Sequence, residues 1–162
     1  MKQSLVSILF FTMTFSCIAQ TNAIQKAWAF YTISLPGREQ TDLDGKNIKP
    51  QPVIERFIYI ETNSKNKPAI DSVLYNSVLF ITTIDSIKEK KITAGINAAT
   101  GKPVVISPKK GNRVWMISLQ QANGMVIAHE QLKKIVLKCR LGKASIKQVI
   151  ANETQLTTPD RY

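Results

Sequence analysis

Beta-branched residues dominate this chain once its first 19 residues are set aside. From residue 20 onwards Ile, Val and Thr number 38, whereas Leu and Ala together number 20. Beta-branched side chains suit the pleated surface of a strand and lose rotamer freedom in a helix. The apolar residues also fall in short runs that clusters of Gly, Pro and Asn separate, rather than in long helical stretches. The sequence therefore predicts an all-β fold.

Nine short runs carry the expected strands. They lie at residues 26–35, 53–61, 71–83, 90–96, 103–107, 113–120, 125–130, 133–141 and 145–151. Hairpin turns are predicted at residues 99–102, at Asn123-Gly124 and at Gly142-Lys143, because Gly and Asn tolerate the positive φ of tight turns. Strands of this number and length predict a single antiparallel β-sandwich, for which the immunoglobulin-like fold is one candidate, with a small β-barrel as the alternative.

An uncharged run covers residues 3–25, directly after Lys2. It is built on an apolar core at residues 5–11, and the pattern is typical of a secretory signal peptide, which has a basic start, an apolar segment and small residues at its exit. We therefore expect a cleaved signal peptide at residues 1–19 and one β-rich domain at residues 20–162, because the remaining length supports a single core. The expected location is the periplasm, the cell envelope or the extracellular space.

Three alternatives exist for the processing of this signal peptide. Cleavage after Ala19, a small residue at the −1 position, makes Gln20 the first residue of the mature protein. A lipid anchor on Cys17 is the second alternative, although Thr14 and Phe15 stand where a bacterial lipobox normally has Leu and a small residue. A retained membrane anchor is the third, for which the run is short and rich in Ser and Thr.

Three stretches resemble known motifs without matching them. The Pro- and Gly-rich interruption at residues 36–52 predicts a surface loop, and its Asp-containing segment 42–45 lacks the ligand spacing of a calcium loop. Residues 95–103 resemble a phosphate-binding loop but have the wrong spacing between their glycines, so a hairpin turn is expected there. The segment that starts at His129-Glu130 resembles the beginning of a zinc-protease motif, yet Lys133 stands where the second His is required.

Catalytic residues are not evident from the sequence. The chain contains one His, which excludes a His-rich metal site. Cys139 shares its strand parity with Ile135 and Leu137, and therefore fits a small core residue better than a reactive thiol. We expect no cofactor, no metal and no enzymatic activity, with a small hydrolase or lyase of unidentified site as the alternative.

Positive charge is the main surface property. Without Lys2 the chain has 21 basic and 11 acidic residues, a net charge of +10 that favours anionic partners. The charge is concentrated in residues 133–147, which contain no Asp or Glu, and smaller basic clusters lie at residues 88–91 and 109–113. Lysine on exposed strands also maintains solubility and blocks edge-to-edge pairing, so the charge has a purely structural alternative explanation.

Strand alternation sorts residues 133–141 into two faces, of which the one with Ile135, Leu137 and Cys139 is expected to point inward. The residues expected to bind anions lie on the outward face, at the turn and on the next strand, and are Lys134, Lys138, Arg140, Lys143 and Lys147. The sequence thus predicts an exported, non-enzymatic cell-envelope protein that binds or scaffolds through a basic hairpin.

Several anions are available to an exported protein. Lipid headgroups, lipopolysaccharide phosphates, acidic glycans and acidic envelope proteins are the expected partners, whereas nucleic acid is less accessible and no motif for it is present. A β-barrel carrier of an apolar ligand is a further alternative. An enclosed apolar cavity would favour the carrier, and a cleft with several titratable groups would favour the enzyme.

Overall fold

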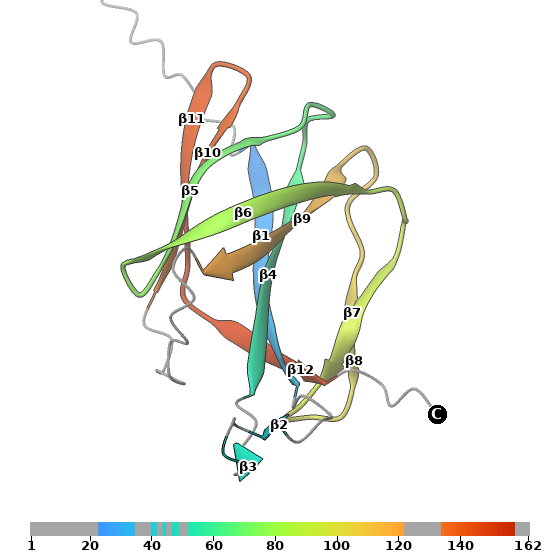
Figure 1. Cartoon of the computed structure of the whole chain (residues 1–162). Coiled ribbons are helices and arrows are strands. Elements are labelled where there is room, and N and C mark those ends of the chain that lie inside the picture. Colours follow the sequence, from blue (N-terminus) through green and yellow to red (C-terminus); the bar gives the residue numbers. More distant parts are fainter. Residues whose placement is uncertain are drawn as a thin grey trace, which may run out of the picture.

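The computed structural model describes residues 23–34, 40–41, 44, 47–48, 52–121 and 134–157, and these ranges contain strands and no helix (Figure 1). The all-β prediction is confirmed. The strands are β1 (Ile24–Ser34), β2 (Gln40–Thr41), β3 (Asn47–Ile48), β4 (Val53–Thr62), β5 (Ala69–Tyr75), β6 (Val78–Ile87), β7 (Ile92–Asn97), β8 (Pro103–Ile106), β9 (Arg113–Gln121), β10 (Ile135–Leu141), β11 (Ala144–Ile150) and β12 (Glu153–Thr157).

Ten of these strands form one sheet, in the order β11-β10-β5-β6-β9-β4-β1-β12-β7-β8, while β2 and β3 pair with each other. Neighbours in the large sheet are antiparallel except β1 and β12, which are parallel. The sheet curls into a half-barrel (Figure 1), so the predicted two-sheet sandwich is not confirmed.

The last two strands explain the curl of the sheet. β11 pairs with β10 at one edge, whereas β12 pairs with β1 six strands further along. Only Ala151 and Asn152 separate β11 from β12 in the chain, so the two ends of the arc from β10 to β1 must lie close together. β1 and β11 accordingly contact each other.

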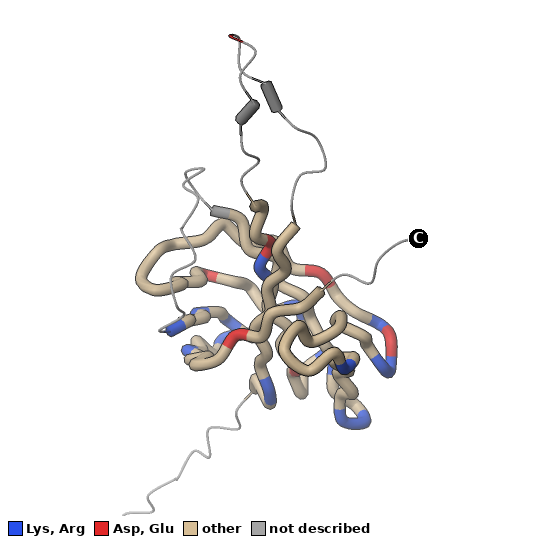
Figure 2. Tube along the Cα trace, turned by 90° about the horizontal axis from the view of Figure 1, so that it is seen from below, with Lys and Arg blue, Asp and Glu red and all other residues tan. Residues whose placement is uncertain are grey.

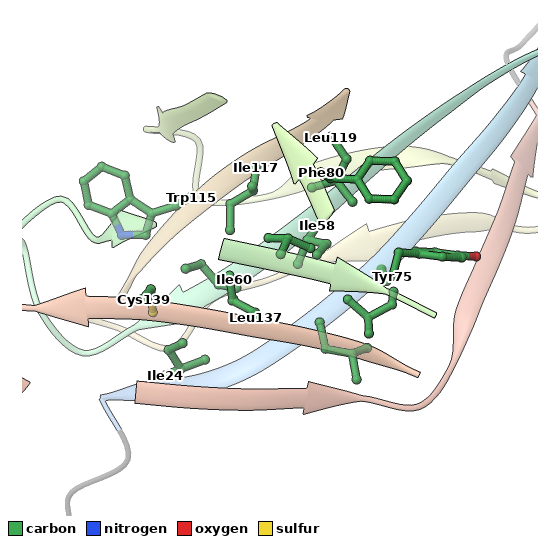
Figure 3. Close-up of a cluster of buried hydrophobic side chains, with 14 residues drawn as sticks. Ile24, Ile58, Ile60, Tyr75, Phe80, Trp115, Ile117, Leu119, Leu137 and Cys139 are labelled. Carbon is green, nitrogen blue, oxygen red and sulfur yellow. The ribbon is translucent and has the colours of Figure 1, made fainter. Parts of the chain in front are cut away.

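Two apolar clusters lie on opposite faces of β1, β4 and β9. The first cluster fills the concave side of the sheet and includes Ile58, Ile60 and Trp115 (Figure 3). The second includes Tyr59 and Val114, which alternate with members of the first along their strands, and β7, β8 and β12 also contribute to it. The centre of the sheet is therefore buried on both faces, and its strands show long apolar runs instead of a simple alternation.

Several strand boundaries differ from those expected. The run at residues 71–83 is two strands, because Asn76 and Ser77 take positive φ (47° and 73°) and close a hairpin between β5 and β6. β12 was not expected, and the interruption at 36–52 contains the short pair β2 and β3. The expected strand at residues 125–130 lies outside the described ranges.

Two of the three predicted hairpin turns are present. Residues 99–102 join β7 to β8, and the Asn97 side chain accepts hydrogen bonds from the backbone N–H groups of Ala99 (2.9 Å) and Thr100 (3.1 Å). Gly142, at φ 63°, begins the turn between β10 and β11. Asn123-Gly124 falls outside the described ranges. No helix in the part of the chain that the structure describes is long and apolar enough to span a membrane.

Candidate functional site

The basic hairpin forms as the alternation predicts. β10 and β11 are antiparallel, and Ile135, Leu137 and Cys139 point into the core with exposed fractions of 0, 0 and 1%. Lys138 stands directly opposite Lys147 in the register, and both are exposed. Side chains of opposite parity therefore lie on the outer face, where two ammonium groups occupy one cross-strand position.

The hairpin face, which we define as Lys134, Lys138, Arg140, Lys143 and Lys147, is exposed at all five positions. Lys134 precedes β10, and two hydrogen bonds to Asn76 hold its backbone against the β5–β6 turn: its N–H donates to Asn76 Oδ1 (3.2 Å) and its carbonyl accepts from the Asn76 N–H (3.0 Å). Lys143 follows Gly142 in the turn. The structure thus gathers the predicted residues on one hairpin.

Arg140 differs from the other members of the hairpin face. Its Nε lies 2.9 Å from Oδ1 of Asp71, a residue of β5, and the two side chains are 61 and 35% exposed. Such an exposed pair contributes little to stability, but it offsets the charge of the guanidinium. The free charge of the face therefore comes mainly from its four lysines, which make no ion pair with any carboxylate in the described ranges.

An apolar row crosses the same outer surface, which the sequence did not predict. Val149, Val136, Leu74 and Leu79 are cross-strand neighbours on β11, β10, β5 and β6. Val149 is 44% exposed and Leu79 is 53% exposed. Ile81, two residues further along β6 and of the same parity as Leu79, is also 53% exposed. The outer surface therefore combines lysines with a contiguous line of apolar side chains.

The positions of these residues follow the strand directions. The outward residues come in the order Lys134, immediately before β10, and then Val136 and Lys138 on that strand, so the apolar row passes between two lysines. On β11 Lys147 is followed by Val149 in the same parity. Lys and Arg outnumber Asp and Glu in the sequence by 22 to 11, and Figure 2 shows Lys and Arg at several turns of the trace.

A buried polar cluster lies on the concave side of the sheet. The Arg56 Nε is 3.7 Å from Oε1 of Glu153, and both side chains are 5% exposed. The Arg56 guanidinium lies 4.7 Å from the ring centroid of Tyr75, whose hydroxyl donates a hydrogen bond to Glu153 Oε2. Burial first, and then this hydrogen bond, raises the pKa of Tyr75 to about 12. The cluster joins β4, β5 and β12 inside the fold.

The thiol of Cys139 has no feature of a nucleophile. It is buried in the first apolar cluster, and burial, followed by the charge of Asp71, raises its pKa. The core assignment of Cys139 is therefore confirmed. His129 and Cys17 lie outside the described ranges. Within those ranges no group of three or more His, Cys, Asp or Glu side chains is arranged to hold a metal ion.

Comparison with known proteins gives no match to a family model, to a curated protein or to a solved structure.

Proposed function

We propose that this protein is an exported, non-enzymatic component of the cell envelope that binds anionic lipid surfaces through the hairpin face and the apolar row. Export rests on the leader-like pattern of residues 1–19. The observation that carries the binding proposal is the passage of the apolar row between Lys134 and Lys138 on one exposed surface.

An anionic bilayer fits this combination better than an acidic glycan. Lysines near an anionic leaflet each contribute about 1 kcal/mol of attraction. Exposed Val and Leu side chains gain further free energy when they enter the boundary between headgroups and acyl chains. A glycan chain would use the lysines but would leave Val149 and Leu79 exposed to water.

The alternative of an apolar-ligand carrier has less support. The concave side of the sheet is the natural position for such a ligand, as in closed barrels. Ile58, Ile117 and Leu137 on that side are 0% exposed and belong to one packed cluster (Figure 3). Packed side chains at this position favour a core over a ligand cavity.

Vesicle binding tests the proposal. We expect the purified mature protein to co-sediment with vesicles that contain phosphatidylglycerol and not with vesicles of phosphatidylcholine alone. Binding should weaken as the ionic strength rises from about 0.05 to about 0.5 M, because the Debye length then falls well below about 10 Å. If neither vesicle binds the protein in a salt-dependent way, the hairpin face serves only solubility and edge protection, and the proposal is wrong.

A further inference from the structure

Two basic clusters that are distant in the sequence meet at one end of the sheet. Ile87, the last residue of β6, pairs with Val114 near the start of β9, which brings the connection after β6 next to the connection before β9. A pocket of about 720 Å³ lies between these connections. The charged residues that line this loop pocket are Lys88, Glu89, Lys90, Lys109, Lys110 and Arg113.

The β8–β9 connection is fixed by a buried carboxylate. Glu61 of β4 is 0% exposed, and its Oε1 accepts hydrogen bonds from the Lys109 N–H (2.9 Å) and from the Asn112 side-chain amide. The Asn112 N–H donates to the Lys109 carbonyl (3.0 Å), and Gly111 takes the φ of 92° that this turn requires. Lys109 and Lys110 are thus attached to a preformed turn, which lowers the ordering entropy that binding must overcome.

The charge of the loop pocket is largely uncompensated. Five cations and one carboxylate line it, and none of the five forms an ion pair within the described ranges. One oxygen of the buried Glu61 carboxylate, Oε1, accepts the two hydrogen bonds from the turn. Like charges held this close repel one another, so an anion that enters the pocket is attracted by all of them at once.

We propose that the loop pocket binds a phosphate ester, either soluble or as a lipid headgroup. Four of its cations are lysines, which bind phosphate as point charges, and a cluster of cations attracts the double negative charge of a phosphate monoester more strongly than the single charge of a carboxylate. The pocket is much larger than a phosphate ion and lies in the size range of small-molecule sites. Ile87, Pro108 and Val114 also line it and offer an apolar wall for the organic part of the ester.

This site is separate from the hairpin face. Leu79 and Ile81 of the outer surface lie near the start of β6, whereas the loop pocket begins at Ile87, the end of that strand. Six to eight residues of strand correspond to about 20–26 Å. Phosphate binding at the loop pocket is therefore independent of lipid binding by the hairpin face, and each can be tested without the other.

Calorimetric titration of the full mature protein tests the phosphate site. The soluble probe is glucose 1-phosphate, the lipid-linked probe is phosphatidylinositol 4-phosphate in vesicles, and glucose and glucuronate are the uncharged and carboxylate controls. The loop variant Lys88→Gln, Lys109→Gln, Arg113→Gln removes three pocket cations. The matched variant Lys134→Gln, Lys138→Gln, Lys147→Gln removes the same charge from the hairpin face. The vesicle titration is carried out in this matched variant, with and without the loop substitutions, so that the hairpin face contributes little to vesicle binding.

We expect at least one phosphate probe to bind, glucuronate to bind more weakly and glucose not to bind. The loop substitutions should lower the affinity for whichever phosphate probe binds by about tenfold or more, whereas the matched variant should change the affinity for glucose 1-phosphate by less than about twofold. Failure of both phosphate probes, equal affinity for glucuronate, or equal loss in the two variants would overturn the proposal. All three loop side chains are exposed, and if the loop variant still misfolds, Lys110→Gln alone provides the same comparison.

Discussion

Replacing Arg56 with Ala is expected to lower the free energy of unfolding by about 3–5 kcal/mol, because it leaves the Glu153 carboxylate buried without its cation. The two side chains are each 5% exposed, and water cannot easily replace the lost partner. Tyr75 also loses the guanidinium that lies over its ring. Urea unfolding, followed by circular dichroism, measures the change.

A double-mutant cycle separates this coupling from a general packing defect. Arg56→Met and Glu153→Gln should each destabilise the fold, and the double variant should be less destabilised than the sum of the two, since both charges are then absent. Strictly additive effects would show that Arg56 and Glu153 are not coupled.

Tyr75 gives the same cluster a signature at high pH. Its pKa is raised from the ordinary 10.0 to about 12 in the folded protein and returns to the ordinary value on unfolding. The unfolded state therefore loses its phenolic proton first. The stability that the neutral Tyr75 contributes is fully present below pH 10 and is lost as the pH rises towards 12.

Charge reversal of the lysines on the hairpin face should have the largest effect on binding. The variant Lys134→Glu, Lys138→Glu, Lys147→Glu removes three cations, each of which contributes about 1 kcal/mol near an anionic leaflet. Binding to phosphatidylglycerol vesicles should weaken by about a hundredfold or more. The remaining binding should depend less on salt, and the unfolding midpoint should change little because the three side chains are exposed. Co-sedimentation measures the affinity.

A control variant makes the same change in net charge at positions outside the hairpin face. Lys65→Glu, Lys91→Glu, Lys102→Glu alters three exposed lysines on other connections. We expect this variant to lose much less affinity for the vesicles. An equal loss in both variants would mean that the overall charge of the protein, and not the hairpin face, attracts the membrane.

Local features of the sequence predicted local features of the fold. The excess of beta-branched residues predicted strands, and the alternation at residues 135–141 predicted which side chains are buried. The β5–β6 turn was missed because Asn76-Ser77 contains no Gly or Pro, although Asn tolerates positive φ. Curling of the sheet was not predictable from any single run, since it depends on two pairings between strands far apart in the sequence, β12 with β1 and β10 with β5.

In the candidate site, too, the features that depend on local sequence were predictable and those that depend on long-range pairing were not. The lysines of the hairpin face could be identified because the turn at Gly142 and the strand parity are local properties. The pairing of Arg140 with Asp71 and the apolar row both depend on the register between β10 and β5. The loop pocket likewise needs the contact between two distant connections, and the sequence showed only its two separate basic clusters.

Contact between lipid and the apolar row is the most direct test of the proposed function. An environment-sensitive dye attached to Leu79→Cys would report the polarity at this row, with Val105→Cys on β8, 40% exposed, as the matched position elsewhere. Cys139 is buried and should not be labelled, which the protein without a new cysteine would verify. We expect phosphatidylglycerol vesicles to shift the emission of the Leu79→Cys dye to the blue and to leave the Val105→Cys dye unchanged. An unchanged spectrum at Leu79→Cys in the presence of bound vesicles, or equal shifts at both positions, would contradict lipid binding through this face.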